Sequence, residues 1–518
     1  MYKFLCNFYK YNESSKKGDA CMKKISISIL CIIVALALIV GVTAVKVRGA
    51  ADDVFLPDSS YINAENLAAG KGAHGFEKLT DGDFSTAYRS FSKSGVQIDL
   101  DLGQTYDFNA LVLKEKGLNI KSFTVLVSED GETFEPIYEG DKIEYHRLCT
   151  FDTVFARYIR LFIGEADRFI SLREIEVYHI ANTGRMDFRT TAYILNSDFT
   201  EFLEADAEEE QKRQMIYDYL ENYRFSGVSN VNYYCGISFD ENGNVLLSGT
   251  TENAEKSKAD IAFVVNCMRE CGREDLKITY VIGMGTGNPQ NNPAMAEHKD
   301  DLITNLISLA NEIGFDGIDI DYEFPQSDYD YEVFGNFLVD LKARMDQEMN
   351  VGTENILSCA FGTRDIDYPG EVVDSIDIVN MMTYDIFDQD GQHSSFWSCA
   401  VQGVAYLESV GFSKEQINIG IPFYGTQTDA LMEQYIYNNI RDYDYYRNEY
   451  TFNSYLNGEP TEVYFNSPAL VRDKTAYAVL SGCGGVMVWH FSCDTDYSSP
   501  YSLWRAVYDS VSRFGGAA

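Results

Sequence analysis

The sequence predicts an eight-stranded β/α barrel preceded by a β-sandwich, and three observations support this fold class. From residue 191 onward, short apolar runs alternate with helical patterns, as they do in parallel α/β sheets. Residues 58–178 instead contain short alternating runs separated by turn residues, which predict an antiparallel sandwich. A chain of 518 residues is long enough for two or more domains.

Eight apolar runs predict the strands of the barrel. They lie at residues 193–196, 232–238, 278–283, 315–325, 356–361, 376–384, 417–423 and 485–489. Eight strands within residues 191–518 fit a barrel closed on itself, and a doubly wound sheet is the alternative. Residues 179–190 form the predicted linker between the two domains.

The run at residues 315–325, FDGIDIDYEFP, carries the most informative pattern. Because side chains alternate along a strand, Asp319, Asp321 and Glu323 share one face and apolar side chains share the other. A solvated edge strand or a calcium loop could also hold several carboxylates, but a calcium loop has no need of alternating aliphatic residues. A site that keeps one carboxyl protonated and another charged selects this pattern.

Residues 316–323, DGIDIDYE, resemble the DGxDxDxE signature of glycoside hydrolase family 18, the chitinases and their relatives. The resemblance implies that Glu323 protonates the glycosidic oxygen and that Asp321 orients the acetamido group of the substrate. It further implies that Asp319 shares a proton with Asp321. In this family the N-acetyl oxygen of the substrate replaces the enzyme nucleophile, so no metal or cofactor is expected.

The ends of other predicted strands carry further matches to the family. MMTYD at 381–385 resembles its MxYD motif, which implies that Tyr384 binds an acyl oxygen and Asp385 a sugar hydroxyl. The catalytic set is therefore Asp319, Asp321, Glu323 and Tyr384, and the substrate-binding set is Tyr193, Asp316, Met382, Asp385, Tyr424 and Trp489. Two departures, VIGM at 281–284 in place of SxGG and Thr426 in place of an arginine, leave substrate length and linkage open.

The predicted sandwich resembles the discoidin-like, coagulation factor type C domains with a galactose-binding-like jelly-roll fold. The matching pieces are LTDGDFSTAY at 79–88, IDLDLG at 98–103, VSEDGETF at 127–134, ARYIRLF at 156–162 and SLREIEVY at 171–178. The resemblance implies carbohydrate binding through loops. The Asp81-Gly-Asp83 loop is either a structural calcium site or an ordinary acidic turn.

Charge and the N-terminal segment limit the partners and the location. A net charge of −37 and a pI near 4.4 exclude binding of nucleic acid or anionic membranes through a basic surface. Within the N-terminal extension, residues 1–51, Met22-Lys23-Lys24 precedes an apolar run at 25–45. This run is either a cleaved signal or a single membrane anchor, and both place the remaining chain outside the cell.

Three functions are compatible with the sequence. The first is a secreted or surface-anchored, chitinase-like hydrolase of β-1,4-linked N-acetylglucosamine. The second is an endo-β-N-acetylglucosaminidase that cuts the chitobiose core of N-glycans on glycoproteins, and the third is a non-catalytic lectin on the same barrel. The retained Glu323 argues against the lectin. A tyrosine-dense insert at residues 435–455 is either a sugar platform or a self-packed loop.

Overall fold

The computed structural model describes residues 62, 64–70, 76–247, 254–285, 287–350, 354–362, 368–387, 393–427 and 433–516. The apolar run at 25–45 lies outside these residues, so the signal or anchor stays a prediction. Across the ranges just given, no helix is both long enough and apolar enough to span a bilayer.

The N-terminal domain is built from six antiparallel strands in the order β1-β6-β2-β5-β3-β4. Alternating side chains of these strands enclose a core of their own, which includes Ile98, Leu100 and Leu161. The strands are β1 (Tyr88–Arg89), β2 (Ser94–Glu115), β3 (Ile120–Ser128), β4 (Glu135–Gly140), β5 (Arg147–Ala166) and β6 (Ser171–Tyr178).

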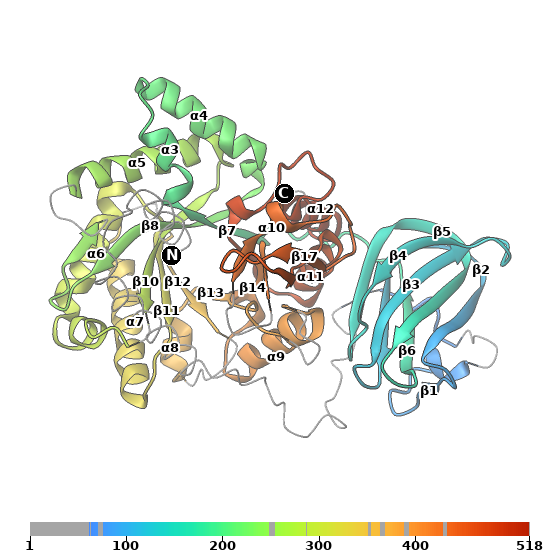
Figure 1. Ribbon diagram of the computed structural model, residues 1–518. Helices are drawn as coiled ribbons and strands as arrows, with labels where there is room; N and C mark the ends of the chain where they lie inside the picture. Colours follow the sequence, from blue (N-terminus) through green and yellow to red (C-terminus); the bar gives the residue numbers. More distant parts are fainter. Residues whose placement is uncertain are drawn as a thin grey trace. The chain divides into compact units, whose positions relative to one another are not determined.

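The C-terminal domain is a closed barrel of eight parallel strands (Figure 1). Each barrel strand pairs with the next barrel strand along the chain, including β8 with β10. The pairing of the last strand, β19, with the first, β7, closes the ring. This closure confirms the barrel and excludes the doubly wound sheet. The strands are β7 (Arg189–Leu195), β8 (Asn230–Phe239), β10 (Lys277–Gly285), β11 (Gly317–Glu323), β12 (Ile356–Phe361), β13 (Ile378–Met381), β14 (Ile417–Pro422) and β19 (Gly485–Trp489).

Helices connect successive strands and cover the outside of the barrel, as Figure 1 shows for α5 to α8. Local sequence fixes their ends: in α11, Ser467 accepts a hydrogen bond from the Leu470 amide, and Gly482 ends the helix in the left-handed conformation. The helices are α3 (Thr200–Leu203), α4 (Glu209–Asn222), α5 (Ala254–Cys271), α6 (Lys299–Ile313), α7 (Asp328–Glu348), α8 (Gly370–Ser375), α9 (Gln402–Ser409), α10 (Tyr437–Ile440), α11 (Pro468–Ser481) and α12 (Leu503–Phe514).

Two short additions interrupt the alternation of strands and helices. Strand β9 (Val245–Leu247) pairs antiparallel with β8. Between β14 and β19 lies an insert with a small antiparallel sheet made of β15 (Tyr424–Thr426), β16 (Gln434–Ile436), β17 (Glu449–Asn453) and β18 (Pro460–Tyr464). Tyr435 is fully buried and stacks on Tyr455 at 4.7 Å, and Tyr437 is also buried. Tyr443 and Tyr455 of the same insert are exposed, at 64% and 42%, so one part of the insert packs on itself and the sugar platform stays a prediction for the other.

A buried polar cluster joins the sandwich to the barrel. Asp473 of α11 is fully buried and accepts hydrogen bonds from the Tyr138 hydroxyl at 2.6 Å and from both the amide and the hydroxyl of Thr150. Arg147 adds an ion pair to the same carboxylate at 3.2 Å. Each donor comes from the sandwich, so a single barrel carboxylate organises this part of the interface between the two domains, which is called the seam below.

Candidate active site

Strand β11 carries its three carboxylates in a column into the barrel, as its alternation predicts. Asp319 is fully buried, Asp321 is 8% exposed, and Glu323 at the strand end reaches solvent. The intervening residues, Ile318 and Ile320 among them, face outward and pack in the main hydrophobic core. The column therefore runs from the closed interior of the barrel to its open end.

Asp319, at the bottom of the column, is held by three neighbouring side chains. One oxygen accepts from the Tyr193 hydroxyl at 2.7 Å, and the other accepts from the Ser358 hydroxyl at 2.5 Å and the Asn380 amide at 3.1 Å. Burial raises the pKa of Asp319 to about 6, although these hydrogen bonds lower it. The carboxyl can therefore hold or release a proton near neutral pH.

Asp321, in the middle of the column, has the most strongly perturbed carboxyl. Burial raises its pKa well above the usual range, and the charges of Glu323 and Asp319 raise it further. Its Oδ1 atom is buried and has no hydrogen-bond partner within the described part of the chain. Buried polar atoms are usually satisfied, so this oxygen is available to a ligand.

Glu323 stands at the mouth of the barrel, at the carboxyl end of β11. Although its side chain reaches solvent, the surrounding walls still desolvate the carboxyl and raise its pKa, and the negative charge of Asp385 raises it further. A glutamic acid that keeps its proton at higher pH than usual is suited to act as a general acid.

An aromatic floor lies beside the carboxylates. Trp489, at the end of β19, packs edge-on against Tyr193 at 5.3 Å and Tyr234 at 6.2 Å. These rings form a cluster with Val281, Met487 and Tyr384 in the interior of the barrel. Tyr193 is only 1% exposed and its hydroxyl is bound to Asp319, so the structure corrects its predicted substrate contact to support of Asp319.

The segment after β13 brings a tyrosine and a carboxylate toward the column. Burial raises the pKa of Tyr384 well above its usual value, and Asp321 and Glu323 raise it further, so its hydroxyl stays protonated as a donor. Asp385 is exposed, and its carboxylate accepts from the Tyr424 hydroxyl at 2.8 Å. Met382 is mostly buried, and its amide donates to the carbonyl of Phe361.

Asp316 does not belong to this site, and the prediction that placed it among the substrate-binding residues is wrong. It lies just before β11, at the end opposite Glu323, where it accepts from the Ile278 amide at 2.8 Å and pairs with Arg269 at 3.0 Å. Asp316 and Asp319 are three residues apart, so strand alternation already puts them on opposite faces. Its role is to join β10, α5 and β11.

Several site residues were not identified from the sequence. Ser358 and Asn380 are polar positions inside otherwise apolar strands, a signal that could have marked both as partners of a buried carboxylate. Tyr234 lies over Gly283, where a Cβ atom would approach its hydroxyl oxygen to 1.8 Å. Because Gly283 pairs in register with Asp321, this glycine lets the ring approach the column.

The Asp81-Gly-Asp83 loop of the sandwich forms a hydrogen-bonded turn, in which the Asp81 carboxylate accepts from the Asp83 amide at 2.8 Å. Glu174 accepts from the Gly82 amide at 2.9 Å, and its pKa is raised to about 8, by burial and then by its hydrogen bond with Asp81. The described residues nevertheless contain no group of three or more His, Cys, Asp or Glu side chains arranged for a metal, so calcium here stays a prediction.

A closed parallel barrel with a protonatable glutamate and an aromatic floor at the carboxyl ends of its strands has the architecture of a barrel glycoside hydrolase. Residues 223–494, more than half of the chain, match the model of glycosyl hydrolases family 18. The chain belongs to this family. Residues 61–175 match the F5/8 type C domain, in agreement with the discoidin-like resemblance of the sandwich.

Individual proteins resemble this chain only at low sequence identity. A protein of Caenorhabditis elegans described as "Probable endochitinase" is 26% identical over 164 residues, which cover 27% of this chain and about a quarter, 26%, of that protein. Among solved structures, the chitinase ChiB of Flavobacterium johnsoniae is 19% identical, with a TM-score of 0.48 and coverage of 62% of this chain and 93% of that one. The chitinase-like agglutinin of Robinia pseudoacacia is 20% identical, with a TM-score of 0.45 and coverage of 62% of this chain and 98% of the agglutinin.

Asp385 gives a test of the acid assigned to Glu323. Its negative charge raises the pKa of Glu323, so Asp385→Asn should lower that pKa. Because the acid acts only when protonated, the basic limb of the pH profile of kcat/KM should move to lower pH in the variant. If the basic limb stays at the same pH, another group carries the proton, even if the maximal kcat/KM changes.

Proposed function

We propose that this protein hydrolyses the glycosidic bond of 2-acetamido sugars by substrate-assisted, retaining catalysis. The observation that carries the proposal is the carboxylate column, in which the exposed Glu323 follows a buried Asp321 oxygen that has no hydrogen-bond partner among the described residues. The N–H of an acetamido group would donate the hydrogen bond that this oxygen lacks. Family membership supports a glycosidase, and family 18 is a known exception to the use of an enzyme nucleophile.

In the proposed first step, Glu323 donates its proton to the glycosidic oxygen as the bond to the anomeric carbon breaks. The carbonyl oxygen of the substrate's acetamido group forms the new bond to that carbon, which gives an oxazolinium ion and a free alcohol. Tyr384 donates a hydrogen bond to the acyl oxygen and holds it in the geometry for attack. Water then attacks the anomeric carbon, its proton passes to the Glu323 carboxylate, and the acetamido group is restored.

Asp319 and Asp321 support the positive charge that develops on the acetamido nitrogen. Two adjacent buried carboxyls cannot both ionise cheaply, so the pair holds one proton. While Asp319 keeps that proton, the Asp321 carboxylate can accept the acetamido N–H. The raised pKa values of both groups support this sharing.

The substrate that we propose is a β-1,4-linked N-acetylglucosamine chain, as in chitin. A chain with a net charge of −37 repels polyanions, whereas chitin is uncharged. The stretch that resembles the C. elegans "Probable endochitinase" agrees with this substrate. The chitobiose core of N-glycans offers the same acetamido chemistry and is the alternative.

Side-by-side digestion tests the proposal. Chitin oligosaccharides and a high-mannose glycoprotein are incubated with the protein, and the products are identified by mass spectrometry. We expect cleavage between N-acetylglucosamine units of the oligosaccharides. NMR spectra recorded early in the reaction, before the product anomers equilibrate, should show the β configuration at the new reducing end. Release of glycans from the glycoprotein alone would favour the chitobiose core. Binding without any cleavage would identify a lectin.

A thiazoline analogue of N-acetylglucosamine separates the two retaining mechanisms. The analogue imitates the cyclic intermediate, so it should inhibit competitively and bind more tightly than the substrate. A fluorosugar that leaves a stable covalent adduct on an aspartate or glutamate would overturn substrate assistance, because it would reveal an enzyme nucleophile.

A further inference from the structure

The sandwich reaches the segment of the barrel that follows the active-site tyrosine. Glu144, in the loop between β4 and β5, is 5% exposed and accepts hydrogen bonds from the Ser395 hydroxyl and from the Trp397 amide, both at 2.8 Å. The neighbouring His146 ring stacks on Trp397, with centroids 6.1 Å apart. The contact therefore fixes both the backbone and a side chain of the barrel segment.

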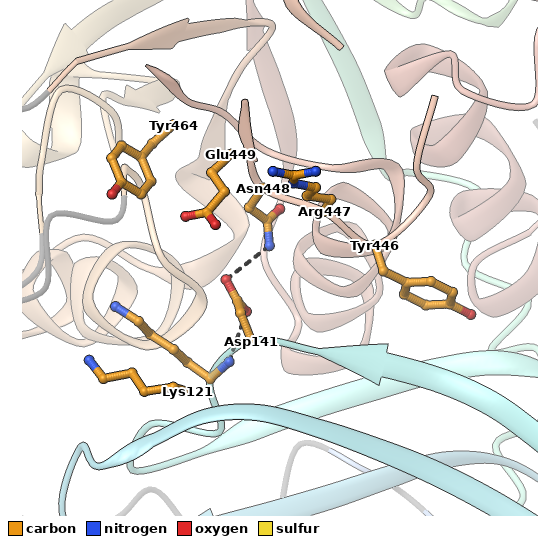
Figure 2. A pocket seen from close by; sticks show the side chains of 8 residues that line it. Lys121, Asp141, Tyr446, Arg447, Asn448, Glu449 and Tyr464 are labelled. Atoms are coloured by element: carbon orange, nitrogen blue, oxygen red, sulfur yellow. Dashed lines mark hydrogen bonds between the residues drawn. The ribbon is translucent and has the colours of Figure 1, made fainter. Parts of the chain in front are cut away.

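A second hydrogen bond holds the same sandwich loop at its other end. Figure 2 shows Asp141 of the sandwich joined to Asn448 of the insert, at 3.1 Å, beside a pocket of about 310 Å³. Three residues later in the loop comes Glu144. The loop is thus fixed at two points against the barrel, which makes it a rigid support.

From Ser395 the contacts continue to the active site through the two preceding residues. The Asp385 amide donates to Nε2 of His393 at 2.8 Å, and the fully buried His393 ring lies against Tyr424 at 5.5 Å. The hydroxyl of Ser394 donates to the Thr383 carbonyl. Thr383 and Asp385 flank Tyr384 in the chain, so this segment holds the backbone on both sides of that residue.

Two further features show that the segment depends on its anchors. Asp385 and Ser394, like Glu144, have left-handed backbones, with φ values of 55°, 53° and 58°. Such conformations are unfavourable for residues other than glycine and persist where surrounding contacts impose them. The ammonium group of the buried Lys474 binds Ser394 from the side of α11. Glu144 and Lys474 thus hold adjacent residues of the segment from two elements.

We propose that Glu144 is a positioning residue for the barrel's active site, and that the sandwich completes the site by holding residues 393–397. Glu144 is buried against the barrel segment, so its effect on the site is indirect. It acts through Ser395 and Trp397 on the segment whose next contacts fix Tyr384 and Asp385. The part of the proposal that concerns catalysis rests on the proposed function, whereas the mechanical coupling does not.

Amide hydrogen exchange of Glu144→Ala tests the coupling without any substrate. The Trp397 amide loses its acceptor and should exchange faster. The decisive peptides cover residues 380–387, because the Asp385 amide has no contact with Glu144 and should exchange faster only if the effect passes through His393. Unchanged exchange there would overturn the proposal. Thr150→Val is the matched control, because it removes a buried hydrogen bond of the same seam, to Asp473. It should leave residues 380–387 unchanged.

Kinetics test the consequence for the reaction. A displacement of about 1 Å in a catalytic group can cost about a hundredfold in rate, so Glu144→Ala should lower kcat by about 10–100-fold at a temperature where it is fully folded. Glu144→Gln keeps one acceptor oxygen and should recover part of the loss. Faster exchange with unchanged kcat would overturn the positioning role.

A second variant keeps the test decisive if Glu144→Ala does not fold. Ser395→Ala removes one of the two hydrogen bonds from the barrel side, and it should change the amide exchange and kcat in the same direction but less.

Failure of the proposed function can be distinguished from failure of this proposal. If the native protein cleaves no acetamido sugar, the proposed function fails. Hydrogen exchange of residues 380–387 then still decides whether the sandwich holds the active-site segment.

Discussion

Replacing Glu323 with glutamine should lower the rate of hydrolysis by about 10²–10⁴-fold, the usual contribution of general acid catalysis. Glutamine keeps the shape of the side chain but has no acidic proton to give to the leaving oxygen. Steady-state kinetics on a chitin oligosaccharide measures the loss in kcat. Calorimetric titration of the same oligosaccharide should still show binding, because Trp489, Asp385 and Tyr424 do not depend on the acid.

The matched control for this variant is Glu371→Gln. Glu371 lies exposed in the first turn of α8, so the same chemical change there should leave kcat and binding as in the native protein. If Glu323→Gln turns over every substrate of the native protein at a near-normal rate, Glu323 is not the acid. Loss of both activity and binding, with the fold intact, would instead assign it to substrate recognition.

Asp473→Ala should lower the free energy of unfolding by about 3–5 kcal/mol, the usual result when one partner of a buried ion pair is removed. The variant leaves the Arg147 guanidinium buried without its carboxylate, and the donors of Tyr138 and Thr150 lose their acceptor. Buried donors without partners retain their desolvation cost. Denaturation in urea, followed by circular dichroism, measures the loss.

A second ion pair across the same seam serves as the control. Asp152 of the sandwich pairs with Arg513 of α12 at 2.9 Å, but its side chain is fully exposed. Solvent screens such pairs, so Asp152→Ala should change stability little. Equal, small effects of the two variants would show that the buried cluster does not stabilise the seam, and that the two domains are held together by other contacts.

The local pattern of the chain predicted the barrel and most of its mouth. Alternation alone put Asp319, Asp321 and Glu323 on one face of β11, and the structure places them on the inner face of the barrel. Because the carboxyl ends of parallel strands meet at one rim, the ends of β13, β14 and β19 brought Tyr384, Tyr424 and Trp489 to the same region. The same alternation, applied to Asp316, would have removed it from the site.

Residues that support the site were harder to predict, because their partners lie far away in the sequence. Ser358 and Asn380 bind Asp319 from the two strands that follow β11, and their distances depend on register across the sheet. Tyr193 belongs to β7 and reaches the same carboxylate across the barrel. A sequence pattern shows that such a residue is buried but not which group it contacts.

By itself, the sequence determined the class of fold, the face of each strand and the chemical types at the strand ends, since these follow from the two-residue period of a strand. Only the tertiary structure decided which oxygen of the column has no partner in the described part of the chain and which domain supports the active-site segment. Glu144 and Ser395 are separated by 251 positions in the chain, and no local pattern relates them. Their contact follows from how the sandwich packs on the barrel, which depends on the shape of both domains.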